Sequence, residues 1–333
     1  MVKEVRKEEL ISGEVDIVGV EPIIEKEYVY DVVIIGAGAS GLTASLYASR
    51  AGLKTLLLER GGHGGQLLNT DTVENYTGTG VIKGVDLAEK MKTDALRFGA
   101  DNKYGDVTGI TVDEDTNLKT VHTTSESYQT KTVIIGTGTT NKKLGIEGEQ
   151  EYLGRGVSYC AVCDGAFFRN RELVVIGGGD SAVEEGLYLT QFADKVTLIH
   201  RRDELRAQKI LQDRFLAHPK TDVIWDANVT SISGKIGVNG VQIYKNKEDR
   251  TYEFETDGVF IYVGLIPNTD AFKDLGILDE EGFIPTNHLM ETKLSGVYAT
   301  GDVRDTPLRQ ISTAVADGSI AGNEVFNYIQ NNF

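Results

Sequence analysis

A thirty-residue pattern occurs twice in the chain, at positions 31–60 and again at positions 172–201. The two copies align without a gap, and each begins with an apolar run that is typical of a buried strand. A G-x-G-x-x-G/A motif follows, and then an apolar helix pattern and a second strand. This order is that of a βαβ unit that binds a dinucleotide, with the pyrophosphate at the helix N-terminus. The duplication predicts an α/β fold with two Rossmann-like, three-layer domains that each bind one dinucleotide.

The two copies differ where the second strand ends. The first copy has Glu59, whereas the second has His200, Arg201 and Arg202, with Arg206 one helical turn later. An acid accepts hydrogen bonds from ribose hydroxyls, and cations accommodate a 2′-phosphate. We therefore expect FAD or NAD in the first copy and NADPH in the second, against the alternative of two purely structural units. The turns supply the remaining predicted ligands, which are Gly36, Gly38, Ser40 and Gly41 in the first copy and Gly177, Gly179, Asp180, Ser181 and Ala182 in the second.

A cysteine pair lies directly before the second copy. Cys160 and Cys163 are the two cysteines of the chain, and Asp164 follows them. With no further cysteine and five scattered histidines, the chain lacks the usual ligand set of a zinc site, so we expect no metal. A C-x-x-C beside βαβ units is typical of a redox pair, although a permanent structural disulfide is the alternative. Asp164 is either a turn residue or a group that moves protons to and from a thiolate.

The motifs together resemble those of the low-molecular-weight thioredoxin reductases of bacteria and archaea, in class II of the pyridine nucleotide-disulfide oxidoreductases. The resemblance runs from about Tyr30 to the C-terminus. It rests on the motifs at 36–41, 64–67, 73–76, 136–140, 160–164, 177–182, 200–206, 300–302 and 309–311.

This resemblance implies a thioredoxin-disulfide reductase that passes electrons from NADPH through FAD and the cysteine pair to thioredoxin. In the family the second cysteine faces the flavin and the first attacks the partner, which assigns Cys163 and Cys160 respectively. Further FAD contacts carried over by motif are Gly65, Gln66, Leu67, Asn75, Thr137, Gly138, Gly301, Asp302, Arg309, Gln310 and Ile311. The family also implies a homodimer.

The repeats predict the domain organisation. We expect an N-terminal extension at 1–29, an FAD-binding domain at 30–142 and 268–333, and an inserted NADPH-binding domain at 143–267 that carries the cysteines. Crossovers are expected at 136–140 and 264–268, strands at 223–232 and 252–263, and a helix from about Ile311. The extension has period-2 passages that fit an edge strand or a partner arm, and a flexible tail is the other interpretation.

Composition and charge also bear on the partners and the location of the protein. The net charge of −16 over 333 residues argues against a nucleic-acid partner. No apolar run reaches the length of a membrane span, and the N-terminus lacks the profile of a signal peptide, so we expect a cytoplasmic protein that does not bind membranes.

Three other functions share parts of this pattern. One is a flavoprotein that reduces a peroxiredoxin or another thioredoxin-like partner, although such chains carry an additional N-terminal C-x-x-C. A flavin-dependent ferredoxin-type reductase shares the two domains but lacks the C-x-x-C. A non-catalytic flavin redox sensor would use the same cysteine pair as a switch.

Overall fold

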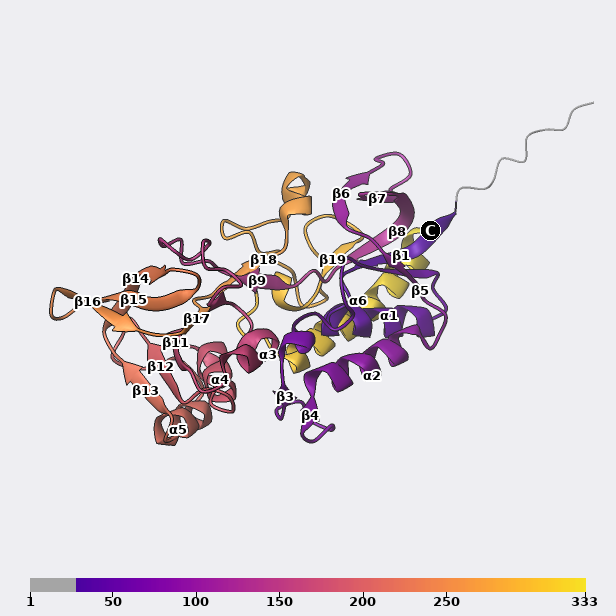
Figure 1. The fold of residues 1–333 in the computed structure, drawn as a ribbon. Coiled ribbons are helices and arrows are strands. Elements are labelled where there is room, and N and C mark those ends of the chain that lie inside the picture. The colour runs from indigo at the N-terminus through magenta and orange to yellow at the C-terminus, as the bar shows by residue number, and fades with distance from the viewer. Residues whose placement is uncertain (1–27) are drawn as a thin grey trace, which may run out of the picture.

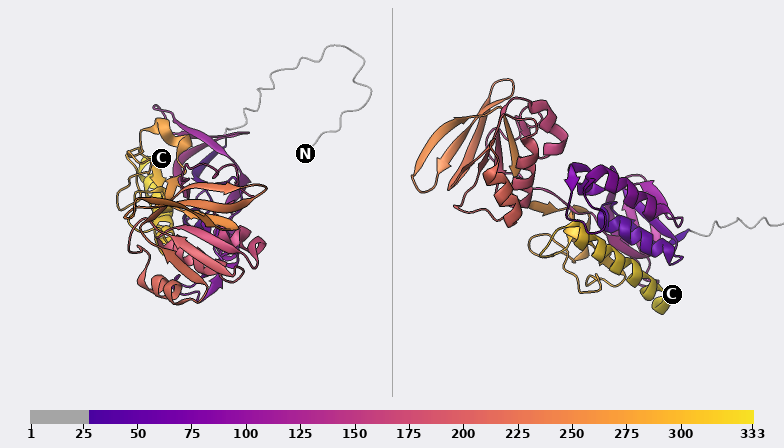
Figure 2. Two further views of the ribbon diagram at one scale, coloured as in Figure 1. Left: turned by 60° about the vertical axis from the view of Figure 1, so that its left-hand side comes forward. Right: turned by 90° about the horizontal axis from the view of Figure 1, so that it is seen from below.

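The computed structural model describes residues 28–333, which form two lobes joined by a narrow ribbon (Figures 1 and 2). The predicted N-terminal edge strand, arm or tail lies outside the described residues. Each lobe has a parallel sheet with helices on one face and antiparallel strands on the other. The predicted α/β fold with two Rossmann-like units is confirmed.

The first lobe is built on a seven-stranded sheet, in which β5, β2, β1, β8, β7 and β6 are neighbours in that order and β19 also pairs with β8. The strands are β1 (Val29–Ile35), β2 (Thr55–Glu59), β5 (Asp101–Tyr104), β6 (Val107–Val112), β7 (Lys119–Thr123), β8 (Ser127–Ile135) and β19 (Val297–Ala299). Its helices are α1 (Ala39–Arg50), α2 (Gly84–Leu96) and α6 (Ile311–Asn332), and its shorter elements are η1 (Gly65–Asn69), β3 (Thr72–Val73), β4 (Ile82–Lys83), η3 (Asp270–Leu275) and η4 (Gly301–Val303).

Successive residues of the central strands point to opposite faces of this sheet. Val32 and Ile34 of β1 pack with residues of α1, α2 and α6, whereas Val33 and Ile35 pack toward β6, β7 and η3. A strand that is buried on both faces reads as a continuous apolar run, which is why the sequence marks β1 so clearly. The C-terminal helix α6 lies against α1, so the first and last elements of the described residues belong to the same lobe (Figure 1).

The second lobe repeats the plan with a five-stranded parallel sheet in the order β10-β17-β11-β12-β13. One face is covered by α4 and α5, and the other by the antiparallel sheet β14-β15-β16. The strands are β10 (Val157–Ser158), β11 (Glu172–Gly177), β12 (Lys195–Ile199), β13 (Thr221–Ile224), β14 (Ala227–Gly234), β15 (Val238–Lys245), β16 (Arg250–Glu255) and β17 (Gly258–Tyr262), and the helices are α3 (Ala161–Asp164), η2 (Gly165–Phe168), α4 (Asp180–Leu189) and α5 (Lys209–Ala217).

The two predicted crossovers pair with each other. β9 (Thr139–Asn141) and β18 (Leu265–Pro267) form an antiparallel ribbon, in which Ile266 lies opposite Thr140. This ribbon carries the chain from the first lobe to the second and back (Figure 2). No helix within residues 28–333 is long and apolar enough to cross a membrane.

Two predicted strands are each divided in the structure. The segment 223–232 breaks at Asp226, which has a φ of +51°, and the chain passes there from the parallel sheet to the antiparallel one. The segment 252–263 breaks at Thr256 and Asp257, where the N–H of Asp257 donates to the carbonyl of Glu172. Both expectations were wrong because a strand-like sequence pattern does not reveal a change of sheet within it.

Replacing Leu57 should test the core of the first lobe. Leu57 is 0% exposed between the sheet and its helices, whereas Leu216 on α5 is 53% exposed. We expect Leu57→Ala to lower the free energy of unfolding by about 2–5 kcal/mol, and Leu216→Ala to change it by less than about 0.5 kcal/mol. Guanidinium denaturation followed by circular dichroism measures both, and equal losses would contradict this account of the core.

Candidate active site

The turn after β1 packs tightly against the loop that follows β8. Gly36 has a φ of +99°, and a Cβ on it would lie 2.4 Å from the carbonyl oxygen of Gly136. A Cβ on Gly38 would meet no atom within 4 Å, so open space lies in front of the turn just where α1 begins. A phosphate can approach the backbone here and meet the unpaired N–H groups at the start of the helix.

Glu59 ends β2 beside this turn. Its Oε2 accepts a hydrogen bond from the N–H of Ala37 at 2.7 Å, and its Oε1 accepts one from the N–H of Gly61 at 2.7 Å. The backbone therefore fixes the carboxylate that the sequence predicts for ribose recognition, and the side chain lines two adjoining cavities.

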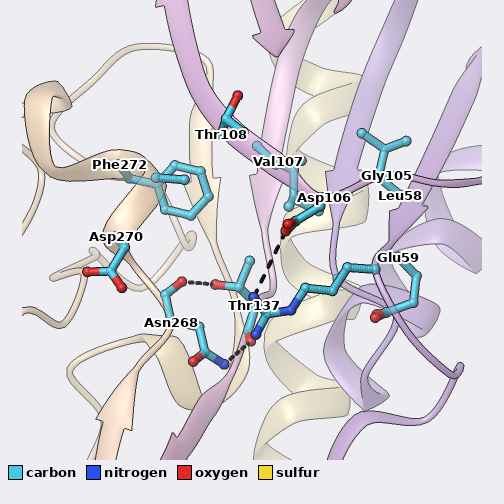
Figure 3. A pocket seen from close by; sticks show the side chains of 14 residues that line it. Leu58, Glu59, Gly105, Asp106, Val107, Thr108, Thr137, Asn268, Asp270 and Phe272 are labelled. Carbon is cyan, nitrogen blue, oxygen red and sulfur yellow. Dashed lines mark hydrogen bonds and ion pairs between the residues drawn. The ribbon is translucent and has the colours of Figure 1, made fainter. Parts of the chain in front are cut away.

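The first of these cavities, of about 430 Å³, lies between the glycine turn and the start of β6 (Figure 3). On one side Thr137 and Asn268 exchange two hydrogen bonds, at 2.8 and 2.9 Å. On the other side Arg60 lies 4.0 Å from Asp106. The segments 105–108 and 270–272 also line this cavity, and sequence reasoning missed them because only folding brings β6 and η3 to the glycine turn.

The second cavity, of about 420 Å³, shares Gly36, Glu59, Thr137 and Asn268 with the first and extends to Cys160. Most of the predicted FAD ligands line it, namely Gly36, Gly38, Ser40, Glu59, Gly65, Gln66, Leu67, Asn75, Thr137, Gly138, Asp302, Arg309, Gln310 and Ile311. Gly41 and Gly301 lie behind the wall. A Cβ on Gly41 would meet the carbonyl oxygen of Gly36, and the N–H of Gly301 donates to Asp317 on α6 at 3.0 Å.

Distant segments fix the polar groups of this second cavity. The Gln66 amide donates to the carbonyl of Thr139 at 3.0 Å, and the Asn75 amide donates to Oε1 of Gln310 at 3.0 Å. Arg309 lies over the ring of Phe283, at 4.4 Å from its centre. Burial raises the pKa of Asp302, and the charge of Arg309 partly opposes that shift.

The cysteine pair forms a disulfide at the far end of the second cavity. Cys160 caps α3, and Cys163 lies within that short helix. Cys160 lines the cavity, whereas Cys163 is exposed with its Sγ 3.8 Å from Oδ1 of Asn69, a lining residue. Residues 28–333 contain no group of three or more His, Cys, Asp or Glu side chains that could hold a metal ion.

Hydrogen bonds from two sides hold this redox turn. The hydroxyl of Ser158 donates to Oδ2 of Asp164 at 2.6 Å, and the N–H of Cys160 donates back to Oγ of Ser158 at 3.0 Å. The N–H of Ala161 donates to the hydroxyl of Tyr262 at 3.0 Å. Asp164 therefore has its carboxylate fixed within the turn that carries the disulfide.

The second glycine turn repeats the geometry of the first. Gly177 has a φ of +156°, and a Cβ on it would lie 2.5 Å from the carbonyl oxygen of Tyr262. Gly179 again faces open space, and α4 begins at Asp180. The carboxylate of Asp180 accepts hydrogen bonds from the backbone and the side chain of Gln208, which ties the start of α4 to the start of α5.

The basic cluster that follows β12 differs in part from expectation. Arg201, Arg202 and Arg206 are exposed, but residues 201–204 form bends in place of the predicted helical turn. The N–H of Arg206 donates to the carbonyl of Gly178 at 2.7 Å and so returns this segment to the glycine turn. His200 is buried, and a Cβ on Gly178 would lie 2.3 Å from its ring. Burial lowers the pKa of His200, so three arginines supply the positive charge and His200 supports the turn.

Comparisons of the sequence and of the structure with known proteins find similar oxidoreductases. Residues 30–318 match the family described as pyridine nucleotide-disulphide oxidoreductase. The thioredoxin reductase of Listeria monocytogenes is 53% identical over 306 residues, which cover 92% of this chain and 95% of that protein. The crystal structure of Lactococcus lactis thioredoxin reductase, in its FR conformation, has 49% identity and a TM-score of 0.89, covering 91% and 99% of the two chains. The Streptococcus pyogenes thioredoxin reductase structure has 52% identity, the same coverages and a TM-score of 0.62.

Gly36→Ala tests the first glycine turn. The added Cβ would strain a positive φ and collide with Gly136, so the corner must open, and we expect the purified protein to lose most of its FAD. Gly52→Ala is the matched control, because Gly52 has a φ of +82° but faces open space on a surface turn. The ratio of flavin to protein absorbance measures both variants, and equal flavin loss would show that backbone strain alone is responsible.

Proposed function

The chain belongs to the pyridine nucleotide-disulphide oxidoreductase family, and we propose that it is an NADPH-dependent thioredoxin-disulfide reductase. Its cofactors are FAD and NADPH. The two adjoining cavities support this proposal, because together they lead from the first glycine turn past Glu59 to the disulfide.

The cavities of the first lobe suit a flavin dinucleotide. The glycine turn offers N–H groups to a pyrophosphate, and Glu59 offers a carboxylate to ribose hydroxyls. Within residues 28–333 the buried hydroxyl of Thr139, which lines the second cavity, has no hydrogen-bond partner and is left for a ligand. When bound, FAD supplies the means to take a hydride from NADPH and to give electrons to a disulfide.

The second glycine turn and the three arginines suit NADPH. Exposed guanidinium groups pair with a 2′-phosphate through charge-assisted hydrogen bonds, and the start of α4 accepts the pyrophosphate. An acid such as Glu59 is replaced here by cations, which makes the two sites selective for different dinucleotides.

The disulfide carries electrons out of the protein. As the family resemblance implies, we assign Cys163 to exchange with the flavin side and Cys160 to attack the disulfide of thioredoxin. In the present arrangement of the lobes Cys160 lines the cavity and Cys163 is exposed, so this assignment requires the lobes to move. Asp164, held by Ser158, is positioned to give a proton to a cysteine thiolate or to take one from a thiol.

We further propose that the lobes have the boundaries 30–142 with 268–333, and 143–267, and that they rotate about the ribbon of β9 and β18. Two relatives with nearly equal identity, 49% and 52%, differ in TM-score at 0.89 and 0.62, as different lobe arrangements would produce. Rotation would let the nicotinamide and the disulfide approach the same cavity in turn.

We also propose where the protein acts and how many chains associate. We place the protein in the cytoplasm, where NADPH is available as the electron source. By family resemblance we expect two chains to associate as a homodimer.

Substituting the arginines tests cofactor choice. Charge-assisted bonds contribute about 1.5–3 kcal/mol before solvent losses, so one lost contact should weaken NADPH binding roughly tenfold. We expect Arg202→Ala to raise the KM for NADPH by about that factor and to leave the KM for NADH nearly unchanged. Equal effects on both cofactors would show that Arg202 does not contact the 2′-phosphate.

Substituting the cysteines tests the electron path. Hydride transfer from NADPH involves no sulfur, so Cys160→Ser should retain a flavin that NADPH bleaches, while thioredoxin reduction is lost. Asp164→Asn should slow thioredoxin reduction without abolishing it, because solvent still supplies protons. Stopped-flow absorbance and a coupled thioredoxin assay measure the two halves of the reaction. Unchanged thioredoxin reduction by Cys160→Ser would remove the disulfide from the path.

A further inference from the structure

Glu185 is a half-buried acid for which the proposed reaction has so far given no role. It lies on α4, and its side chain lines the same cavity as Cys160 and Tyr262. Within residues 28–333 its Oε2 is shielded from solvent and has no hydrogen-bond partner. A carboxylate in such a place loses its hydration without compensation, so the neutral acid is favoured.

Tyr262 connects this region to the redox turn. Its hydroxyl oxygen accepts the N–H of Ala161, the residue that follows Cys160, at 3.0 Å. That bond leaves the hydroxyl proton of Tyr262 available for donation. Burial raises the pKa of Tyr262, and the charges of Glu185 and of Asp164 both act on its hydroxyl. Tyr262 therefore lies within the influence of two acids, one on α4 and one beside the disulfide.

The charged surroundings of Glu185 also favour its protonated form. Burial, together with the charges of Glu184 and Asp71, raises the pKa of Glu185 to about 8. Glu185 is thus mostly protonated at neutral pH and loses its proton as the pH rises through about 8. The charges of Glu184 on α4 and of Asp71 after η1 act on Glu185, and Glu185 in turn acts on Tyr188 and Tyr262. The other titratable groups that line its cavity are Glu59, Arg60, Tyr159, Asp302 and Arg309, while Asp164 acts on Tyr262.

We propose that Glu185 stores a proton for the redox disulfide and exchanges it with the cysteine pair through the hydroxyl of Tyr262. This role rests on the proposed reductase function. Glu185 is then a positioning residue, because it acts on the cysteine pair only through Tyr262. Asp164 has a different role, since Ser158 holds its carboxylate in the turn of the disulfide itself.

The step balances in protons and electrons. The hydride of NADPH supplies two electrons, which break the Cys160–Cys163 bond and leave two thiolates, and one proton, which is released to solvent. Tyr262 gives its proton to one sulfur and takes the proton of Glu185, which leaves a thiol, a thiolate and a carboxylate. When the pair passes both electrons to the disulfide of the partner, the S–S bond forms again and the thiol proton returns to Glu185. The two sulfurs of the partner take protons from solvent.

Redox-difference infrared spectroscopy tests the stored proton without relying on turnover. The holoenzyme is reduced with dithiothreitol near neutral pH, and the carbonyl band of a protonated carboxylic acid is followed. We expect the wild type to lose this band on reduction, and the Glu185→Gln variant to show no such loss. Glu172→Gln removes an acid from the surface of the same lobe, at the exposed start of β11, and should keep the wild-type signal. A band loss that persists in Glu185→Gln, or that is absent from the wild type, would overturn the proposal.

The pH dependence of disulfide reduction tests the route through Tyr262. After rapid mixing with NADPH, the recovery of flavin absorbance reports electron transfer to the disulfide. In the wild type this rate should fall as the pH rises through about 8. At neutral pH, Glu185→Gln should be slower by about tenfold or more, with no step near that pH, and Tyr262→Phe should behave in the same way.

The variants separate this inference from the proposed function. Restoration of the pH step by Glu185→Asp would support the stored proton, because a carboxyl is again present. A Tyr262→Phe profile identical to the wild type would overturn the relay. A wild type that shows the infrared band loss but cannot reduce thioredoxin would contradict the proposed function and leave the role of Glu185 at the disulfide supported.

Discussion

The antiparallel pairing of β9 with β18 connects the two lobes and aligns the parts of the site. The first lobe holds this ribbon through the Gln66 amide, which donates to Thr139. From the ribbon, the Asn141 amide donates to the carbonyl of Tyr159, the residue before Cys160. A chain of hydrogen bonds thus runs from the wall of the cavity to the redox turn. Two hydrogen-bonded strands resist stretching but can twist. The ribbon could therefore guide the proposed rotation of one lobe against the other and still keep the two lobes at a fixed separation.

Direct contacts between the lobes are few and polar around the redox turn. Arg214 on α5 forms an ion pair with Glu74 of the first lobe, and both side chains are nearly half exposed. Such exposed pairs contribute about 0–1 kcal/mol, so they bias the arrangement of the lobes without fixing it. The contact of Cys163 with Asn69, at 3.8 Å, is equally weak. The present arrangement therefore brings the disulfide to the cavity at little energetic cost, and leaving it costs equally little.

The same backbone turn serves two cofactors because charge is placed differently around it. In the first lobe, backbone N–H groups hold Glu59 at the end of β2. In the second, exposed arginines follow β12 on a chain whose net charge is −16, so they form a local exception that attracts a phosphate. At the cavity the balance is reversed around Glu185, because burial and the charges of Glu184 and Asp71 raise its pKa. In the second lobe the proposed phosphate site and the proposed proton store therefore lie in different electrostatic surroundings, the first among arginines and the second among acids.

Local sequence determined the parts of this protein that depend on neighbours within about thirty residues. The glycine turns, the strands and helices around them, the short helix of Cys160 and Cys163, and the contrast between Glu59 and Arg201 are all of this kind, because backbone conformation and strand burial leave a periodic pattern. Tertiary structure decided what depends on distant packing. It buried His200 beneath Gly178, moved the chain to another sheet at Asp226, and joined Asn75 to Gln310 across 235 positions. It also brought β6 to the first cavity and shielded Oε2 of Glu185 from solvent. Burial and electrostatic environment arise from the whole fold, so no spacing along the chain could have revealed them.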